Sequence, residues 1–116
     1  MRRTTVLTLV LAAMIVAVPA AAGALPSMPS SNFPAATGCG CHGDLTAQWG
    51  GSMHAKALSD PLYLHKLKQA DEATDGEVTG FCLSCHTPVG VMSGEVTGID
   101  HSGASAVAAE GVTCTF

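Results

Sequence analysis

The amino-acid sequence predicts a mostly α-helical, loop-rich fold with few or no strands. No stretch alternates apolar and polar residues as a half-buried strand does. Aspartate followed by proline at positions 60 and 61 is a strong helix start, whereas 13 glycines and 6 prolines divide the chain into short segments. Large apolar side chains are scarce after residue 24, so a domain this small needs a disulfide, a metal or a large cofactor to complete its core.

The first 24 residues are predicted to be a signal peptide. Arg2 and Arg3 give a positive start, an apolar run follows from Val6 to Val18, and residues 22–24 (Ala-Gly-Ala) offer a cleavage site. The apolar run is shorter than the roughly 20 residues that cross a membrane. We therefore expect a periplasmic or extracellular protein. The alternative is an uncleaved anchor, which would keep the protein at the membrane.

The charge of the exported part argues against one class of partner. Without residues 1–24 the chain has three lysines, no arginine and nine acidic residues, which is a formal net charge of −6. Nucleic-acid binding needs clustered cations that neutralise phosphates. We therefore expect no nucleic-acid partner.

The segments before residue 60 are predicted as a leader and one helix. Three prolines among serines predict an extended leader over residues 25–37, ahead of a domain at 38–116. The first helix is expected from Asp44, as its N-cap, to Leu58. The glycine pair Gly50-Gly51 weakens its middle.

A second helix is predicted over residues 61–70, capped by the aspartate that precedes it. Leu58, Leu62 and Tyr63 share a side with Leu67 at roughly helical spacing. The remaining expectations are a turn at 74–76, a cysteine-bearing segment at 81–90 in which Pro88 prevents a long helix, irregular structure at 91–104, and a short helical turn at 104–110.

The strongest chemical signal is the motif Cys82-Leu83-Ser84-Cys85-His86, which is C-x-x-C-H, the attachment motif for c-type haem. Two intervening residues let the cysteine sulfurs reach the two vinyl groups of one haem. The adjoining histidine then falls beneath the iron as an axial ligand. The alternative interpretations are a zinc knuckle and a disulfide loop.

A second cluster, Cys39-Gly40-Cys41-His42, is similar but irregular, because only one residue separates its cysteines. His42 directly follows Cys41, as the histidine follows the second cysteine in C-x-x-C-H. Cys41 is therefore a candidate for one thioether and His42 for an iron ligand. Cys39 either reaches the other vinyl group in strained form or stays free.

Cys114 stands two residues before the last residue. Adding Cys-His would turn this ending into another C-x-x-C-H, so Cys114 is a candidate for half of a further site, and the sequence is predicted to be truncated there. The alternative is an isolated cysteine.

Zinc and disulfides account for these residues less well. A zinc ribbon uses C-x₂₋₄-C pairs, whereas one pair here is C-x-C, and zinc gives no reason for a histidine directly after both pairs. Five cysteines leave one unpaired in a purely disulfide-bonded protein.

Further histidines are candidates for the second axial position. His54 lies 12 residues after His42. On a continuous helix the two would be about 18 Å apart, so His54 would serve the iron of a different haem. His101 is a second candidate ligand, whereas His65 is expected on an exposed helix face. The alternatives are that these are surface histidines, or that a thioether ligand comes from Met53 or Met92.

The stretch from Cys41-His42 through Trp49 to Ser52-Met53-His54-Ala55 resembles the tetrahaem c-type cytochromes associated with hydroxylamine oxidation and related respiratory chains. In that family a tryptophan and an S-x-H-A segment follow C-H, and the histidine of that segment is an axial ligand. The resemblance implies this role for His54, and covalent haem at Cys82 and Cys85 with His86 as ligand. Residues 110–114 look like the family's approach to a further haem. The chain departs from the family in the first cysteine spacing and in the incomplete last motif.

These observations predict electron transfer by about two haem c groups, with a third site incomplete and with redox proteins or other multihaem cytochromes as partners. The rival is a subunit of a multihaem reductase or oxidoreductase that acts on small nitrogen or sulfur compounds. Such an enzyme needs an open iron position beside acid and base groups, and the sequence shows no cluster of these. A structural zinc or disulfide domain is the third interpretation.

Overall fold

The computed structural model describes residues 27–38 and 40–115, and it contains helices and loops with no strand among them. The mostly α-helical, loop-rich prediction is thereby confirmed. The signal peptide predicted at 1–24 lies outside the described residues. In order, the elements are the 3-10 turns η1 (Ser30–Asn32), η2 (Ala36–Gly38) and η3 (Gly40–His42), then the helices α2 (Gly43–Gly50), α3 (Pro61–Thr74), α4 (Thr79–His86), α5 (Pro88–Ser93) and α6 (Ala106–Ala109).

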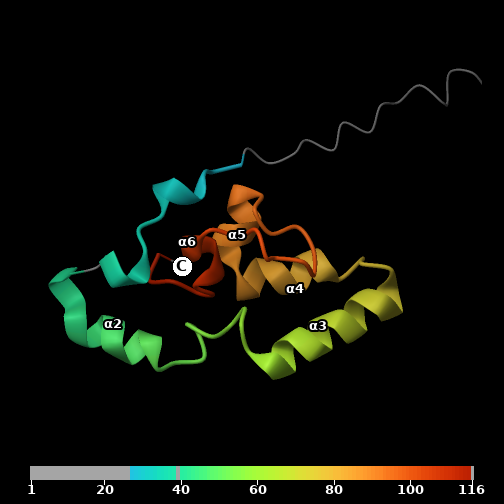
Figure 1. Cartoon of the computed structure of the whole chain (residues 1–116), viewed down its shortest axis with the longest axis horizontal. Helices are drawn as coiled ribbons and strands as arrows, with labels where there is room; N and C mark the ends of the chain where they lie inside the picture. Colours follow the sequence, from blue (N-terminus) through green and yellow to red (C-terminus); the bar gives the residue numbers. More distant parts are fainter. Residues whose placement is uncertain (1–26, 39, 116) are drawn as a thin grey trace, which may run out of the picture.

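Helices α3 and α4 form a hairpin, and α5, α6 and η1 form a group of short elements at the end of α4 (Figure 1). Helix α4 leads into α5 through the single residue Thr87, and α5 contacts both α6 and η1. Helix α2 extends away from this group on the other side of the molecule (Figure 1). None of the described helices is long and apolar enough to cross a membrane.

The hydrophobic core is small and is assembled from four segments. Leu58, Leu67, Leu83 and Val96 are each no more than 3% exposed. The core thus places Leu83, between the two cysteines of the motif, on the inner side of α4. Several larger apolar side chains stay on the surface instead, among them Phe81, which is 78% exposed, and Leu62, which is 68% exposed. Leu62 therefore does not share the buried side with Leu67 as the spacing predicted.

Helix α3 begins where the sequence predicts and runs one turn further. The Asp60 carboxylate accepts a hydrogen bond from the backbone N–H of Tyr63 at 2.9 Å, so the expected N-cap is confirmed. The helix ends at Thr74 rather than Ala70, because no residue before the turn interrupts it. Asp75 and Gly76 then adopt left-handed backbone conformations, with φ values of 49° and 83°, which close the predicted turn.

Helix α2 is shorter than the predicted helix at 44–58. It spans Gly43–Gly50, and residues 51–59 form successive turns. The glycine pair explains the early end, because glycine costs about 1 kcal/mol in a helix relative to alanine. The Ser52 hydroxyl also donates to the Trp49 carbonyl at 2.7 Å, which the next helical turn would otherwise use. Asp44 lies in the first turn and is not the N-cap; that position belongs to His42.

The expectations for the rest of the chain hold with one correction: residues 91–93, predicted to be irregular, form the end of helix α5, and the irregular chain begins only at Gly94. Helix α4 ends at His86 and α5 begins at Pro88, so proline divides the cysteine-bearing segment as predicted. Irregular chain follows α5. The short helical turn predicted at 104–110 is α6, whose N-cap Ser105 accepts from the N–H of Ala108.

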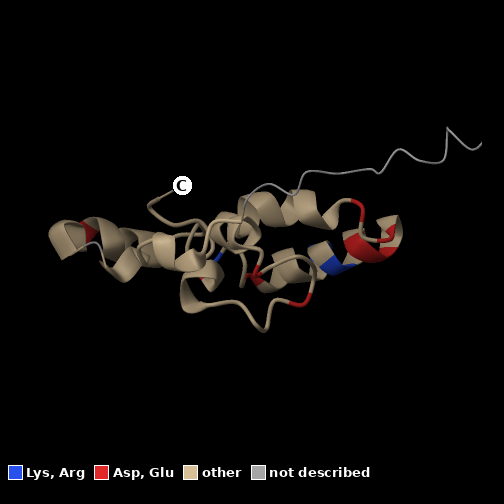
Figure 2. Cartoon of the chain, turned by 90° about the horizontal axis from the view of Figure 1, so that it is seen from above, with Lys and Arg blue, Asp and Glu red and all other residues tan. Residues whose placement is uncertain are grey.

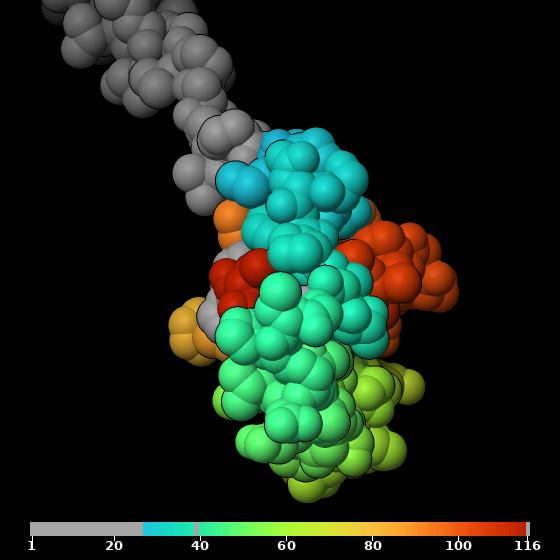
Figure 3. Space-filling model, turned by 90° about the vertical axis from the view of Figure 1, so that its left-hand side faces the viewer, coloured from blue at the N-terminus to red at the C-terminus, as the bar shows by residue number. Residues whose placement is uncertain are grey.

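The leader has more structure than the predicted extended chain. Prolines favoured extension, but η1 and η2 fold within it, and hydrogen bonds that include two backbone N–H donors hold it to the domain. The Met28 N–H donates to the Met92 carbonyl at 3.0 Å, and the Ala36 N–H donates to the Glu110 carboxylate at 2.9 Å. Figure 3 shows the C-terminal residues in red beside the leader and α2, in cyan to green.

Charge is unevenly distributed over the described residues. Acidic residues gather where α3 ends and the chain turns into α4 (Figure 2). These residues are Asp71, Glu72, Asp75 and Glu77. Four of the nine acidic residues of the chain therefore lie at one end of the helical hairpin.

Candidate functional site

Helix α4 presents the C-x-x-C-H motif on one side. Cys82, Cys85 and His86 are at positions i, i+3 and i+4, which are neighbours on a helix surface. Leu83 lies on the opposite side of α4 and is fully buried. Its burial fixes the helix with the motif residues facing outward. Cys82 is half-buried and Cys85 is exposed, and neither forms a disulfide within the described residues. The structure thus brings together the three motif residues that the sequence predicted.

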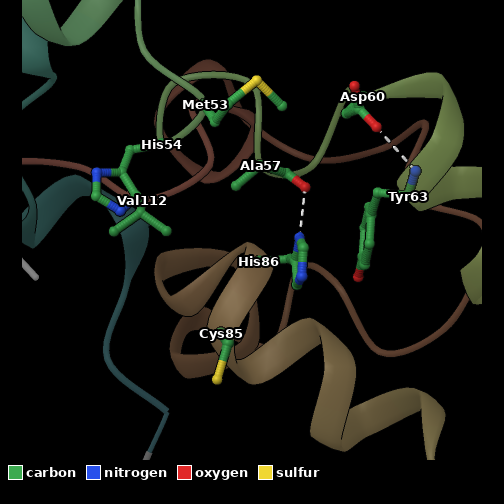
Figure 4. A pocket seen from close by; sticks show the side chains of 8 residues that line it. All are labelled: Met53, His54, Ala57, Asp60, Tyr63, Cys85, His86 and Val112. Carbon is green, nitrogen blue, oxygen red and sulfur yellow. Dashed lines mark hydrogen bonds between the residues drawn. The ribbon is translucent and has the colours of Figure 1, made fainter.

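The His86 imidazole is held by the backbone of a distant segment. Its Nδ1 lies 2.6 Å from the carbonyl oxygen of Ala57 (Figure 4). A carbonyl oxygen only accepts hydrogen bonds, so Nδ1 carries the proton and donates it. Nε2 then keeps its lone pair, which is the arrangement found in metal-ligating histidines. The local structure therefore prepares His86 as a ligand through Nε2.

Tyr63 packs flat against the His86 ring. The ring centroids are 3.6 Å apart and the planes differ by 5°. The Tyr63 hydroxyl is buried and makes no hydrogen bond within the described structure. Burial raises the pKa of Tyr63 to about 12, with smaller contributions from the neighbouring Cys82 and Cys85. The sequence placed Tyr63 on an apolar helix side but offered no signal that it would contact a residue 23 positions later.

Two cavities meet at His86. One, of about 500 Å³, lies along the α3–α4 hairpin; its lining includes both motif cysteines together with Leu67, Ala70 and Phe81. The other, of about 370 Å³, lies between α3, α4 and the turns at 51–59. Tyr63, Cys85 and His86 line both. The lining of the second cavity is completed by Met53, His54, Ala57, Asp60 and Val112 (Figure 4).

His54 therefore lines the same cavity as His86, although its side chain is exposed and its ring lies beside Val112, on the far side of the cavity from His86 (Figure 4). The turns at 51–59 carry it there, although the sequence expected it on a continuous helix. Met53 lines the same cavity, so both the imidazole and the thioether remain candidates for the second axial position. Met92 lines neither cavity.

The remaining candidate residues lie elsewhere. Cys41 and His42 are exposed in η3, directly before α2. His101 is half-buried in a loop, with its Nδ1 3.1 Å from the Ile99 carbonyl oxygen, and it lines neither cavity. Cys114 is exposed, two residues beyond Val112 of the smaller cavity. Cys39 lies outside the described residues.

The site fits a haem attached through sulfur. Two thiols spaced along one helix side, an imidazole with a free Nε2 and largely apolar cavity walls match a large, flat, mostly apolar group. Zinc would need several ligands that converge on one point. Within the described residues, no three side chains of His, Cys, Asp or Glu come together in that way.

A helical, loop-rich chain with this thiol pair and adjoining ligand-ready imidazole defines a c-type cytochrome, a protein that transfers electrons through covalently bound haem. The chain belongs to the family described as cytochrome c554 and c-prime, whose model matches residues 38–116. The resemblance to a multihaem c-type cytochrome family is thereby confirmed. Searches of curated proteins and of solved structures found no match.

Proposed function

We propose that this chain is an exported electron carrier in which Cys82 and Cys85 hold one haem c and His86 ligates its iron. Haem supplies an iron centre that accepts and returns one electron. Each cysteine adds its sulfur and its proton across one vinyl C=C bond. Attachment therefore forms two C–S bonds without an oxidant, and the protein gains the whole mass of the haem.

The hydrogen bond from His86 Nδ1 to the Ala57 carbonyl carries this proposal. It supports one tautomer and one ring orientation, with Nε2 free. The Tyr63 ring covers one side of the imidazole and limits its rotation. A histidine with a merely structural role would have no need for a free, oriented second nitrogen beside two thiols.

His54 is our candidate for the sixth ligand of the same iron. It lines the cavity that His86 also lines, from a different segment of the chain. If His54 and His86 both ligated a haem iron, they would leave it no open position for a substrate, which suits electron transfer rather than substrate turnover. Met53 is the alternative ligand, and its thioether would raise the reduction potential.

We propose a second haem at Cys41 and His42, which would make the chain a multihaem cytochrome. Both residues are exposed and adjacent in η3, so a thioether and an iron ligand are sterically accessible there. Cys114 is proposed as half of a third site, and the role of His101 as a ligand has no support from a neighbouring thiol or cavity.

Export and partners follow from sequence and charge. The Arg2-Arg3 start and the apolar run support a signal peptide and a periplasmic or extracellular location. Redox proteins are the expected partners. The acidic end of the α3–α4 hairpin favours partners with a basic contact surface, because complementary charge speeds association.

Intact mass tests the proposal. The full chain would be exported by cells that contain haem-attachment machinery, and its mass measured after denaturation. We expect covalent haem in the parent and one haem fewer in the Cys82→Ser/Cys85→Ser double variant. Ser84→Ala, between the two cysteines, is the control and should keep the parent mass. A double variant with the same haem count as the parent would exclude attachment at this motif.

A further inference from the structure

We propose that Trp49, Gly111 and Val112 form a backbone clamp that positions His54 in its cavity. This role rests on the proposed ligation by His54 and adds positioning residues to it. The sequence motifs gave none of the three a role in positioning His54.

Hydrogen bonds connect the clamp to His54 through its main chain. The Val112 N–H donates to the His54 carbonyl oxygen at 3.0 Å. The Val112 carbonyl in turn accepts the indole N–H of Trp49 at 2.7 Å. Val112 is therefore held from both sides, by the end of α2 and by the turn that carries His54, and its side chain lines the cavity (Figure 4).

Gly111 lets the chain approach this closely. It is buried and has a φ of 77°. A Cβ at this position would lie 2.5 Å from the His54 carbonyl oxygen and 3.1 Å from the Ala57 nitrogen. Any other residue would push the His54 turn away, since both atoms belong to backbone rather than to a flexible side chain.

The same turn also controls His86. Residues 54–57 receive the clamp at His54 and offer the Ala57 carbonyl to His86 Nδ1. One short segment thus positions both candidate axial ligands. A displacement of the clamp would therefore move His54 and the carbonyl that orients His86 together.

The test compares two single variants, Trp49→Phe and Gly111→Ala, with the parent. Each is made as the exported, haem-loaded full chain. Phenylalanine keeps an aromatic ring but removes the indole N–H, together with part of the ring's volume. Loss of one ordinary hydrogen bond should raise the ratio of unligated to ligated His54 about fivefold. This appears as a larger high-spin fraction in the electron paramagnetic resonance spectrum and as a shifted midpoint potential. The haem count by intact mass should stay unchanged.

Gly94→Ala is the matched control for Gly111→Ala. Gly94 has a nearly identical φ of 75°, but nothing lies within 4 Å of its Cβ position. It therefore reports backbone strain without the contact to His54, and its spin state should equal that of the parent. His65→Ala, on the exposed side of α3, should also leave the spectrum unchanged.

His54→Ala separates the two proposals. A high-spin signal in this variant establishes His54 as a ligand, and the clamp is then overturned if Trp49→Phe and Gly111→Ala both keep the parent spectrum and potential. If Gly111→Ala does not fold, Trp49→Phe alone decides. An unchanged spectrum in His54→Ala refutes ligation by His54 itself, and the clamp with it, while the haem count still reports on Cys82 and Cys85.

Discussion

The imidazole of His86 lies flat against the phenol ring of Tyr63, with ring centroids 3.6 Å apart and planes that differ by 5°. The ring nitrogen Nδ1 is at the same time hydrogen-bonded to the Ala57 carbonyl. A side chain and a backbone group from two different segments therefore set the orientation of the proposed iron ligand before any cofactor is considered.

Substitutions of Tyr63 should separate its ring from its hydroxyl. Tyr63→Leu removes the stack, and we expect a loss of about 1 kcal/mol from the free energy of unfolding, as for other aromatic pairs. Tyr63→Phe keeps the ring and removes a buried hydroxyl that has no partner, so its stability should equal or exceed that of the parent. Chemical denaturation of the haem-loaded proteins measures both. Equal destabilisation by the two variants would contradict a role for the ring.

Glu95 should make stability depend on pH in the acid range. Hydrogen bonds from Ser30 and from Ser105 lower the pKa of Glu95 below its ordinary value of 4.5; the Ser105 N–H lies 2.7 Å from its carboxylate. A lowered pKa means that the stabilisation is complete above the ordinary value and is lost as the pH falls through the folded-state value.

We therefore expect Glu95→Gln to weaken the pH dependence of unfolding between about pH 5 and pH 3. Urea unfolding of the parent and of the variant at several pH values across this range gives the slope of the free energy of unfolding against pH for each protein. Asp100→Asn is the comparison, because this carboxylate also has a lowered pKa but its hydrogen-bond partner, Ser102, is local. Identical slopes for Glu95→Gln and the parent would rule out the contribution of Glu95.

Two helical glycines should respond to alanine in opposite directions. A Cβ on Gly90 in α5 would lie 2.5 Å from the Thr87 hydroxyl and 2.7 Å from a Val96 methyl, both in buried residues. We expect Gly90→Ala to cost about 1–3 kcal/mol through overpacking. Gly80 in α4 has open space around it, so Gly80→Ala should gain about 0.5–1 kcal/mol from helix propensity. Thermal unfolding decides, and a stabilising Gly90→Ala would contradict the packing of α5 on Val96.

Cys41 should be required for a second haem. We expect Cys41→Ser to lower the haem count by one, because this cysteine alone stands directly before His42. Intact mass after export measures the count. Cys39→Ser, measured in parallel, shows whether that residue contributes a thioether. Haem retained in full by Cys41→Ser would remove this second site from the proposal.

The local features of the molecule were predictable from the sequence, because each depends on neighbours along the chain. Asp60 before Pro61 determines the start of α3, Pro88 ends the cysteine-bearing helix, and the spacing of Cys82, Cys85 and His86 puts them on one helix side. The glycine pair was recognised as a weak point, but its effect was underestimated, so the helix was expected to continue to Leu58.

Only the tertiary structure decided what surrounds His86. The carbonyl of Ala57 reaches it across 29 residues, and Tyr63 covers it from another helix. The pairing of Val112 with the His54 turn spans a still longer stretch of chain. Such contacts depend on how separate segments pack around Leu58, Leu67 and Leu83. Carbonyl groups are present at every residue, so no local pattern in the sequence marks the one that will meet the ligand.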